Sequence, residues 1–449
     1  MSSPSEIEAR VRADDRAHVF HSWSAQELID PMPIARADGV RFYDYSGTAY
    51  LDFASQLVNA NLGHQHPAIV DAIKEQAGRL CTVAPGFAND VRGELAAMVA
   101  ERAPGDLDKV FFTTGGADAN EHAMRMAKLH TGRHKILAAY RSYHGATAAS
   151  ITATGDPRRW ANEPGEPGIV HFFGPYPYRS AFGATSDAQE CELALRHLEQ
   201  VIALEGPQTV AGVLIETIVG TNGVLVPPDG YLAGVREICD RYGVVMICDE
   251  VMSGFGRVGE WFACQHWDVT PDLITFAKGV NSGYVPLGGV VISQAVAETF
   301  AKRSYPGGLT YSGHPLACAA GVGSINAFEK EQLLEHVRRL GETVVAPRLR
   351  DLADRHPCVG QVRGLGLMWA IELVRDRETR QMLVPFNASG PDAAPMAEFA
   401  ARCRANGLWP FTHFNRVHVV PPLVIGEEDL VAGIEIIDDA LGAVDEMVR

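Results

Sequence analysis

The stretch Val244-Val-Met-Ile-Cys-Asp249 decides the fold, because it is an unbroken apolar run that stops at an acidic residue. Four more runs of this kind occur along the middle of the chain: Lys109–Thr114, Val210–Glu216, Asp272–Ala277 and Gly288–Ser293. Runs of this length suit strands that are buried on both faces. Helical periodicity separates them, for example over Ala117–His130 and Tyr231–Tyr242. Alternating strands and helices predict an α/β fold with a mostly parallel central sheet and helices on both faces.

The chain on either side of this central region follows a different pattern. Its predicted elements are a hairpin, a long helix, a glycine-interrupted strand region and a final helix: Arg41–Gly47, Ile325–Ala353, Val359–Val374 and Asp429–Val448. We therefore expect both chain ends to build a smaller α+β domain. Residues 1–60 would join this domain, residues 61–324 would form the large domain, and residues 325–449 would complete the small one.

Composition and charge narrow the possible classes of function. The 449 residues carry 39 basic and 55 acidic side chains, and the net charge of -16 argues against nucleic acid or an anionic membrane as partner. Residues Met1–Arg16 lack the apolar run of a secretory signal, and no stretch approaches the ~18 apolar residues of a membrane span. The eight cysteines include no Cys-x-x-Cys pair, so we expect reduced thiols, no metal site and a cytoplasmic protein.

Three of the predicted strand ends carry groups whose chemistry fits together. Gly115 and Gly116 lead from one run into a helix, whose first N–H groups could bind a phosphate. Asp249 ends a buried run, where its carboxylate needs a partner such as a protonated pyridine nitrogen. Lys278 follows Asp272–Ala277, and burial there would lower the pKa of its amine and make it a nucleophile. Taken singly, these features also fit a plain turn, a structural ion pair and a solvated lysine, so the prediction rests on their conjunction.

The segments around these strand ends also resemble a known family. Four of them carry the likeness, which extends from about Asp44 to Leu441: Val245–Val251, Gly254–Gly259, Asp272–Gly279 and Thr310–Pro315. They are similar to the class III aminotransferases, the fold-type I family of ω-amino acid and amine:pyruvate transaminases. The resemblance implies pyridoxal 5′-phosphate (PLP) as cofactor, and an enzyme that moves an amino group from an amine donor to a 2-oxo acid. Thr310 would reach the phosphate of a neighbouring subunit, which implies a homodimer with shared sites, or a tetramer.

The resemblance further implies roles for residues at matching positions. Lys278 would hold PLP as an internal aldimine and move the proton between substrate and cofactor, while Asp249 would pair with the pyridinium nitrogen. Glu216 matches a glutamate of the family's sites. The remaining residues would surround the phosphate and the ring: Gly115, Gly116 and Ala117 at the phosphate, Tyr143 and Val251 on opposite ring faces, and His144 at the ring. Tyr143, His144 and Val251 could instead be core residues, and Glu216 could be the ion-pair partner of an arginine.

The substrate region departs from the family pattern. Many amine:pyruvate transaminases carry a mobile arginine before Pro-Pro-Leu, and its place here falls at Phe411 or Thr412. The nearest arginine is Arg416, which could bind a carboxylate or sulfonate or lie on a solvated strand edge. Val58 stands where several relatives place a tryptophan, and Trp23 could cover the site or anchor the core. We expect a small ω-amino acid donor such as taurine, β-alanine or 4-aminobutyrate, with pyruvate or 2-oxoglutarate as acceptor.

Two other functions fit parts of the same pattern. A lyase, decarboxylase or aminomutase would keep the same site and break another bond, because fold and cofactor do not fix the reaction. Dependence on a keto acid acceptor separates a transaminase from these enzymes. A cofactor-binding regulatory domain would need a DNA-binding module, and the sequence shows neither a basic patch nor spare length for one.

Overall fold

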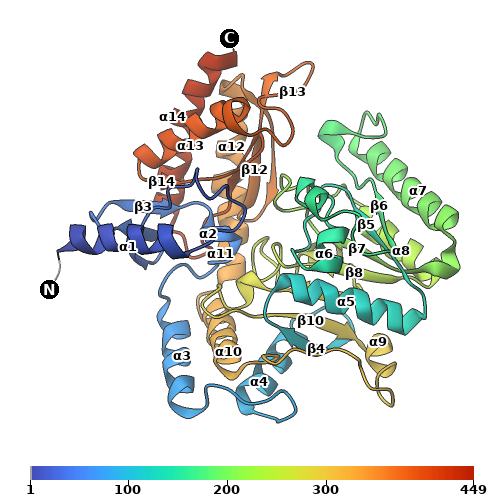
Figure 1. Ribbon diagram of the computed structural model, residues 1–449. Helices are drawn as coiled ribbons and strands as arrows, with labels where there is room; N and C mark the ends of the chain where they lie inside the picture. Colours follow the sequence, from blue (N-terminus) through green and yellow to red (C-terminus); the bar gives the residue numbers. More distant parts are fainter. Residues whose placement is uncertain (1–2, 449) are drawn as a thin grey trace.

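A seven-stranded sheet forms the centre of the computed structural model, which describes residues 3–448 (Figure 1). Its strands lie in the order β4-β10-β9-β8-β7-β5-β6. They span Leu107–Thr113 (β4), Lys135–Ala139 (β5), Ile169–Phe172 (β6), Val210–Glu216 (β7), Val245–Asp249 (β8), Leu273–Phe276 (β9) and Gly288–Ser293 (β10). Every neighbouring pair is parallel except the two that β10 makes with β9 and β4. The predicted mostly parallel α/β sheet is confirmed.

Both faces of this sheet are covered, because successive strand residues point into two separate cores. In β8, Ile247 belongs to the core beneath α5, whereas Met246 and Cys248 belong to the core beneath α7 and α8. These helices span Gly116–Thr131 (α5), Asp187–Glu205 (α7) and Tyr231–Tyr242 (α8). The unbroken apolar runs of the sequence therefore reflect burial on both sides.

Shorter elements complete the large part of the molecule. The helices are α2 (Ser55–Val58), α3 (Pro67–Arg79), α4 (Asp90–Ala100), α6 (Ala148–Ala153), α9 (Gln294–Glu298) and α10 (Pro315–Lys330). The 3-10 turns are η1 (Pro157–Asn162), η2 (Pro177–Arg179), η3 (Pro207–Thr209), η4 (Ala263–Trp267) and η5 (Lys278–Val280), while η7 (Gly390–Ala393) precedes α13 (Ala394–Ala405) in the small part. Helix α10 packs against α3 and α4, near the place where the large and the small part of the molecule meet (Figure 1).

Both chain ends build the second, smaller part of the molecule. One sheet has the order β1-β2-β3-β14, and its parallel β3–β14 pair brings Leu51 opposite Leu408. The other has the order β11-β12-β16-β15, with β13 paired to β12. The strands are β1 (Ile34–Asp38), β2 (Arg41–Asp44), β3 (Ala49–Asp52), β11 (Val359–Leu365), β12 (Met368–Asp376), β13 (Gln381–Met382), β14 (Leu408–Trp409), β15 (Phe411–His413) and β16 (Arg416–Val419). The expected α+β unit from both ends is confirmed, while its boundaries at residues 60 and 324 remain a prediction.

The predicted long helix over Ile325–Ala353 is wrong, because the helix is interrupted between Lys330 and Leu333. Gln332 adopts a left-handed φ of 52°, which ends α10 and starts a new helix. The segments are α11 (Leu333–Leu340), a wide π-helical turn η6 (Gly341–Val345) and α12 (Ala346–Arg355), followed later by α13 (Ala394–Ala405) and α14 (Glu427–Val448). Within residues 3–448, no helix is both long and apolar enough to cross a membrane.

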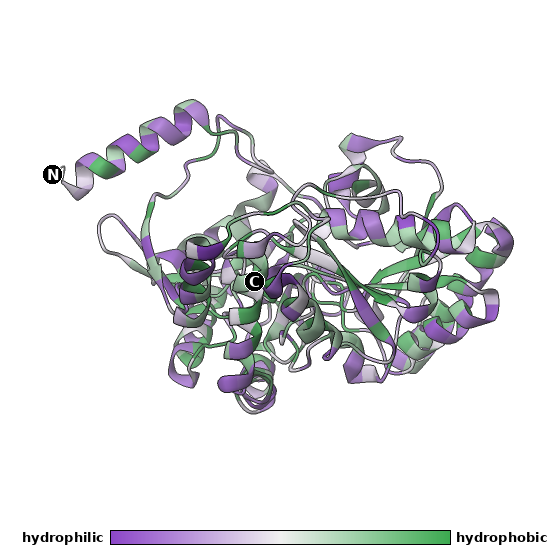
Figure 2. Cartoon of the chain, turned by 90° about the horizontal axis from the view of Figure 1, so that it is seen from below, coloured by the Kyte–Doolittle hydropathy of each residue, from purple (hydrophilic) through white to green (hydrophobic). Residues whose placement is uncertain are grey.

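The N-terminal helix α1 (Pro4–His18) lies outside the packed body, and Figure 2 shows it extending away from the rest of the chain. A capping box fixes its start, since Ser3 Oγ accepts from the Glu6 N–H and the Glu6 carboxylate accepts from the Ser3 N–H. None of its residues is buried. The segment after it exposes Phe20 (86%), Trp23 (67%) and Leu28 (86%). This arm offers apolar side chains that its own chain does not cover.

Candidate active site

A cavity of about 420 Å³ opens at the carboxyl ends of the central strands. This is where open α/β sheets bind their ligands. The structure brings nine of the predicted site residues to this one cavity: Gly115, Gly116, Ala117, Tyr143, His144, Glu216, Asp249, Val251 and Lys278. Residues from strands far apart in sequence thus meet because their strands end at the same edge of the sheet.

Asp249 is the most tightly held of these residues. Its side chain is 3% exposed, and its Oδ2 accepts from His144 Nδ1–H at 2.7 Å and from Asn120 Nδ2–H at 2.8 Å. Its Oδ1 accepts from the backbone N–H of Val251 at 3.0 Å. Thr275 Oγ1–H in turn donates to Asn120 Oδ1 and fixes the amide's orientation. These three donors stabilise the Asp249 carboxylate at the end of β8 and fix its orientation.

The turn between β4 and α5 forms a close-fitting cradle. Gly115 caps the helix without a side-chain hydrogen bond, which leaves the helix N–H groups free to bind an anion. A Cβ atom on Gly116 would lie 2.8 Å from Val251 Cγ1, so a side chain would close the cavity there. Asp118 holds the preceding backbone, because its carboxylate accepts from the N–H and the hydroxyl of Thr114. The turn therefore has the shape and the donors that a phosphate needs.

Lys278 begins the short turn η5 directly beyond β9. Its φ of 44° lies in the left-handed region, an uncommon and strained conformation for a residue with a long side chain. Burial lowers the pKa of its amine below the ordinary value, against the opposing effect of the Asp249 and Glu216 carboxylates. A larger share of the amine is therefore neutral and nucleophilic than in an exposed lysine.

Glu216 ends β7 and ties two loops together. Its Oε1 accepts from the Tyr143 N–H and its Oε2 from the Gly220 N–H, each at 2.8 Å. Burial raises the pKa of this carboxyl to about 7, and the nearby Asp249 charge adds to the effect while His144 opposes it. Glu216 therefore changes its protonation in the neutral pH range.

Sequence reasoning missed two residues that shape this site. Asn120 lines the cavity, but in the sequence it is only a polar residue inside a predicted helix. It stands four positions after Gly116, one helical turn on, which is the signal that could have identified it. Arg158 lies with its guanidinium 3.6 Å from the centre of the Tyr143 ring and is ion-paired with the buried Asp156. Its position in η1 carries no strand-end signal.

Four predicted residues do not line the cavity in the single chain. Val58 is buried in an apolar cluster with Ile218 and Met252, next to the lining residues Leu57 and Asn59. Trp23 lies on the exposed N-terminal arm. Thr310 lies on the surface before α10. The fourth, Arg416, is fully buried behind the loop Gly220–Val224, since Thr221 lines the cavity while Gly223 packs against Arg416.

Arg416 lies among charged side chains on the sheet formed by β11, β12, β16 and β15. It stands opposite Glu372 on β12, with its Nε 3.8 Å from Glu372 Oε2. Glu372 also binds Arg179 and Arg363, and although burial opposes it, these arginines and Arg416 lower the Glu372 pKa to about 2. Within residues 3–448, none of the three guanidinium nitrogens of Arg416 has a hydrogen-bond partner. Three arginines thus share a single carboxylate, and one of them keeps its donors free.

The strand-end lysine, the strand-end aspartate and the glycine turn together define a fold-type I PLP-dependent transferase. The aminotransferase class-III family model matches residues 23–441, and the chain belongs to this family. A solved structure of taurine:2-oxoglutarate aminotransferase from Bifidobacterium kashiwanohense is 43% identical, covers 98% of this chain and 99% of its own, and has a TM-score of 0.95. An (S)-enantioselective ω-transaminase structure from Thermomicrobium roseum is 36% identical, with coverages of 97% and 98% and a TM-score of 0.91. A taurine–pyruvate aminotransferase of Bilophila wadsworthia is 33% identical over 95% of this chain and 96% of its own.

The chain is therefore a PLP-dependent aminotransferase. The site fits this cofactor on three observations: a lysine that lines the cavity and whose amine has a lowered pKa, a carboxylate held by His144 and Asn120, and a glycine turn that a Cβ atom would block. His144 Nε2 is buried without a partner, which leaves one further polar atom for a bound group. Within residues 3–448, no cluster of three His, Cys, Asp or Glu side chains could hold a metal ion.

Proposed function

We propose that Lys278 holds PLP covalently and that Asp249 faces its ring nitrogen. The phosphate would bind the N–H groups of Gly116 and Ala117 beside Gly115. The three contacts that hold Asp249 and the open helix start after Gly115 support this assignment. When bound, the cofactor supplies an aldehyde and an electron sink for the carbanion formed at the donor carbon.

The protein side of the mechanism rests on Lys278. Its amine has a lowered pKa, so it would be able to take the proton from the donor carbon and deliver it to the cofactor's aldehyde carbon, two atoms along. Tyr143 and Val251 line the cavity and would hold the ring from opposite faces, with His144 steadying the Asp249 carboxylate. Glu216 would set the position of Tyr143 through its backbone N–H.

We infer that the donor is a short ω-amino acid with a terminal carboxylate or sulfonate. The observation that carries this proposal is Arg416, a fully buried guanidinium whose nitrogens lack hydrogen-bond partners in the described chain. A buried cation with free donors is costly unless an anion joins it, and the planar fork of arginine suits a carboxylate or a sulfonate. Arg158 adds a second positive charge beside Tyr143. The taurine-named relatives support the same substrate class, with pyruvate or 2-oxoglutarate as acceptor.

For Arg416 to meet a substrate in the cavity, the loop Gly220–Val224 or the arginine side chain must shift. The loop is attached to the cavity by the Gly220 N–H bond to Glu216 and to the small sheet by contact of Gly223 with Arg416. Val58 lies beside this loop, in one apolar cluster with Val224 and Met252, and its neighbour Leu57 lines the cavity. With valine where relatives have a tryptophan, the site offers less aromatic surface to an arylalkyl amine.

We further propose that the enzyme works as a homodimer or tetramer in the cytoplasm. Thr310 and Tyr311 are exposed in the single chain, as are Phe20, Trp23 and Leu28 on the N-terminal arm. A second copy that covers them would bring Thr310 to the partner's phosphate site and Trp23 over a substrate site. Seven of the eight free cysteines are buried thiols, which suits a reducing compartment.

A donor and acceptor panel tests the proposal. Purified enzyme should transfer the amino group of taurine, β-alanine or 4-aminobutyrate to pyruvate or 2-oxoglutarate, and should stop after one turnover when the keto acid is omitted. Preference for 1-phenylethylamine over every ω-amino acid would refute the donor class. Continued turnover without an acceptor would refute transamination with these donors.

A further inference from the structure

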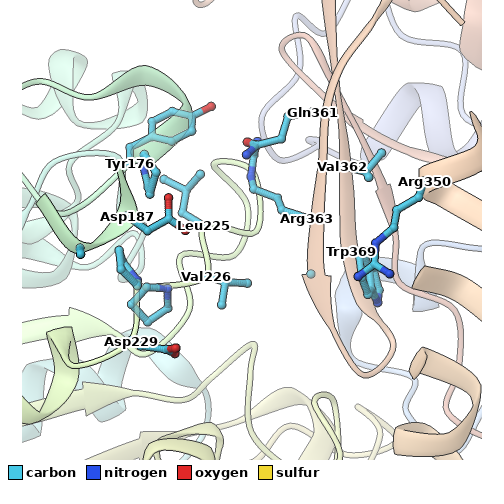
Figure 3. Close-up of a pocket in the computed structure, with 15 residues that line it drawn as sticks. Tyr176, Asp187, Leu225, Val226, Asp229, Arg350, Gln361, Val362, Arg363 and Trp369 are labelled. Carbon is cyan, nitrogen blue, oxygen red and sulfur yellow. The ribbon is translucent and has the colours of Figure 1, made fainter. Parts of the chain in front are cut away.

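A second cavity, which Lys278 does not line, lies between the two parts of the molecule; Figure 3 shows its two walls. Its volume is about 620 Å³, within the range of small-molecule sites. The large part supplies Tyr176 and the segment 225–229, and the small part supplies the segment 361–364 of β11 and Trp369 of β12. Among the described residues, this cavity and the catalytic cavity have no lining residue in common.

Opposite charges stand on the two walls of this cavity. Asp187, in the first turn of α7, and Asp229 lie on the large-domain wall, whereas Arg350 of α12 and Arg363 of β11 lie on the small-domain wall (Figure 3). In the described part of the chain, Asp187, Asp229 and Arg350 form no ion pair within 4 Å. Asp187, Asp229 and Arg350 therefore face the cavity without an ion-pair partner, whereas Arg363 is paired with Glu372.

Arg363 is held in place with one nitrogen to spare. Its Nε donates to Gly223 O at 2.7 Å, and its Nη1 donates to Gln361 Oε1 at 2.7 Å and meets Glu372 Oε2 at 2.8 Å. Within residues 3–448 its Nη2 has no hydrogen-bond partner and almost no accessible surface. The guanidinium is therefore fixed inside the small-domain wall, where its positive charge adds to that of Arg350. Between the charged walls, Leu225, Val226 and Trp369 provide apolar surface.

We propose that this interdomain cavity binds a zwitterion whose ammonium and acid groups stand at opposite ends of a short aliphatic chain. The ammonium group would pair with Asp187 and Asp229, the carboxylate or sulfonate with Arg350 and Arg363, and the chain would lie against the apolar surface. A dianion or a dication would leave one wall unpaired. The binding is non-covalent, and the proposal does not depend on which donor reacts at Lys278.

A bound zwitterion would connect the two parts of the molecule. The two walls belong to the large and the small part of the molecule, so a ligand that pairs with both charges stabilises their present arrangement. The enzyme would then sense ω-amino acids of the kind proposed as donors at a place where they do not react.

Calorimetric titration of the holoenzyme tests this proposal with 4-(dimethylamino)butanoate and 6-(dimethylamino)hexanoate. These zwitterions are tertiary amines and cannot condense with an aldehyde, so they do not react at Lys278. We expect one site per chain for at least one of them, weakened by added salt because part of the affinity is ionic. Butanoate and butyldimethylamine, which carry one charge each, should bind more weakly than the corresponding zwitterion. Absence of binding by both zwitterions would overturn the proposal.

Three variants locate the site. Arg350→Gln and Asp229→Asn should each weaken binding roughly two- to fivefold, and together roughly tenfold, because each removes one exposed ion pair. Arg348→Gln is the matched control, since Arg348 is exposed on the same helix but does not line the cavity. All three should keep normal turnover with the reactive donor, which verifies folding. Unchanged affinity in the double variant would place the ligand elsewhere and refute the proposal.

Discussion

The floor of the catalytic cavity and the sheet face behind it treat buried charge in opposite ways. On the floor, formed by Glu216, Asp249 and Lys278, every carboxylate oxygen already accepts a hydrogen bond. On the sheet face around Arg416, buried guanidinium nitrogens lack partners in the described chain. A group that stays bound through the reaction cycle calls for fixed, satisfied polar atoms, which need no reorganisation. A group that arrives and leaves calls for donors that its departure sets free.

Loss of the floor amine should have the largest effect. Lys278→Ala removes the amine that we propose as both covalent attachment and proton carrier, so we expect kcat to fall at least about 10³-fold. Turnover and the visible absorbance of the bound cofactor measure this directly. Lys302→Ala changes the next lysine in the sequence, which is exposed and does not line the cavity, and should leave both unchanged. Near-normal activity of the Lys278 variant would contradict the central assignment.

The second-largest fall in kcat is expected when the charge of Asp249 is removed without a change of side-chain shape. Asp249→Asn keeps the side-chain volume but removes the negative charge. The neutral amide accepts weaker hydrogen bonds from His144 and Asn120 than the carboxylate does. We expect kcat to fall roughly 10²-fold, as electrostatic stabilisation is lost. Single-turnover kinetics with excess donor would measure it. Asp229→Asn serves as control, and equal rates in the two variants would argue against the role of Asp249.

Arg416→Met tests the sheet face behind the cavity. It should weaken the binding of acidic donors and at the same time stabilise the folded protein. KM for acidic donors should rise about 10-fold or more, since a charged hydrogen bond contributes about 1.5–3 kcal/mol, while KM for an uncharged amine stays constant. The free energy of unfolding should rise by about 1 kcal/mol or more, because an unsatisfied buried charge is gone and Glu372 keeps Arg179 and Arg363. Urea unfolding checks the second effect, with Arg348→Met as control. A destabilised variant with unchanged KM would show that Arg416 is structural.

Over a single pH unit, the smallest predicted effect concerns Glu216. Its pKa is raised from 4.5 to about 7 in the folded state, so between these values the folded chain holds a proton that the unfolded chain has lost. Stability should therefore fall as pH rises through this window, by about 1 kcal/mol per pH unit from this group. Glu216→Gln has no such proton to lose and should show a correspondingly flatter stability profile. Parallel profiles for the two proteins would contradict the assignment.

The residues on the floor of the cavity could be predicted from the sequence, whereas the position of Arg416 on the sheet face behind it could not. Asp249, Glu216 and Lys278 each end an apolar run, and parallel strands bring their carboxyl ends to one edge whatever the loops do. Arg416 depends instead on how the loop Gly220–Val224 packs between two sheets distant in sequence, and no periodicity reports that contact. Local conformation was equally hidden, since the left-handed Gln332 interrupts a stretch whose apolar spacing is continuous.

The backbone at Lys278 has a consequence for protein engineering. A left-handed φ of 44° favours glycine or asparagine over lysine, so the fold alone would select a different residue at this position. A design procedure that optimised stability without regard to chemistry would replace the amine that we propose as the cofactor's attachment. Without cofactor, the inactive product would be the more heat-resistant protein, and a screen for thermal tolerance of the apoprotein alone would prefer it.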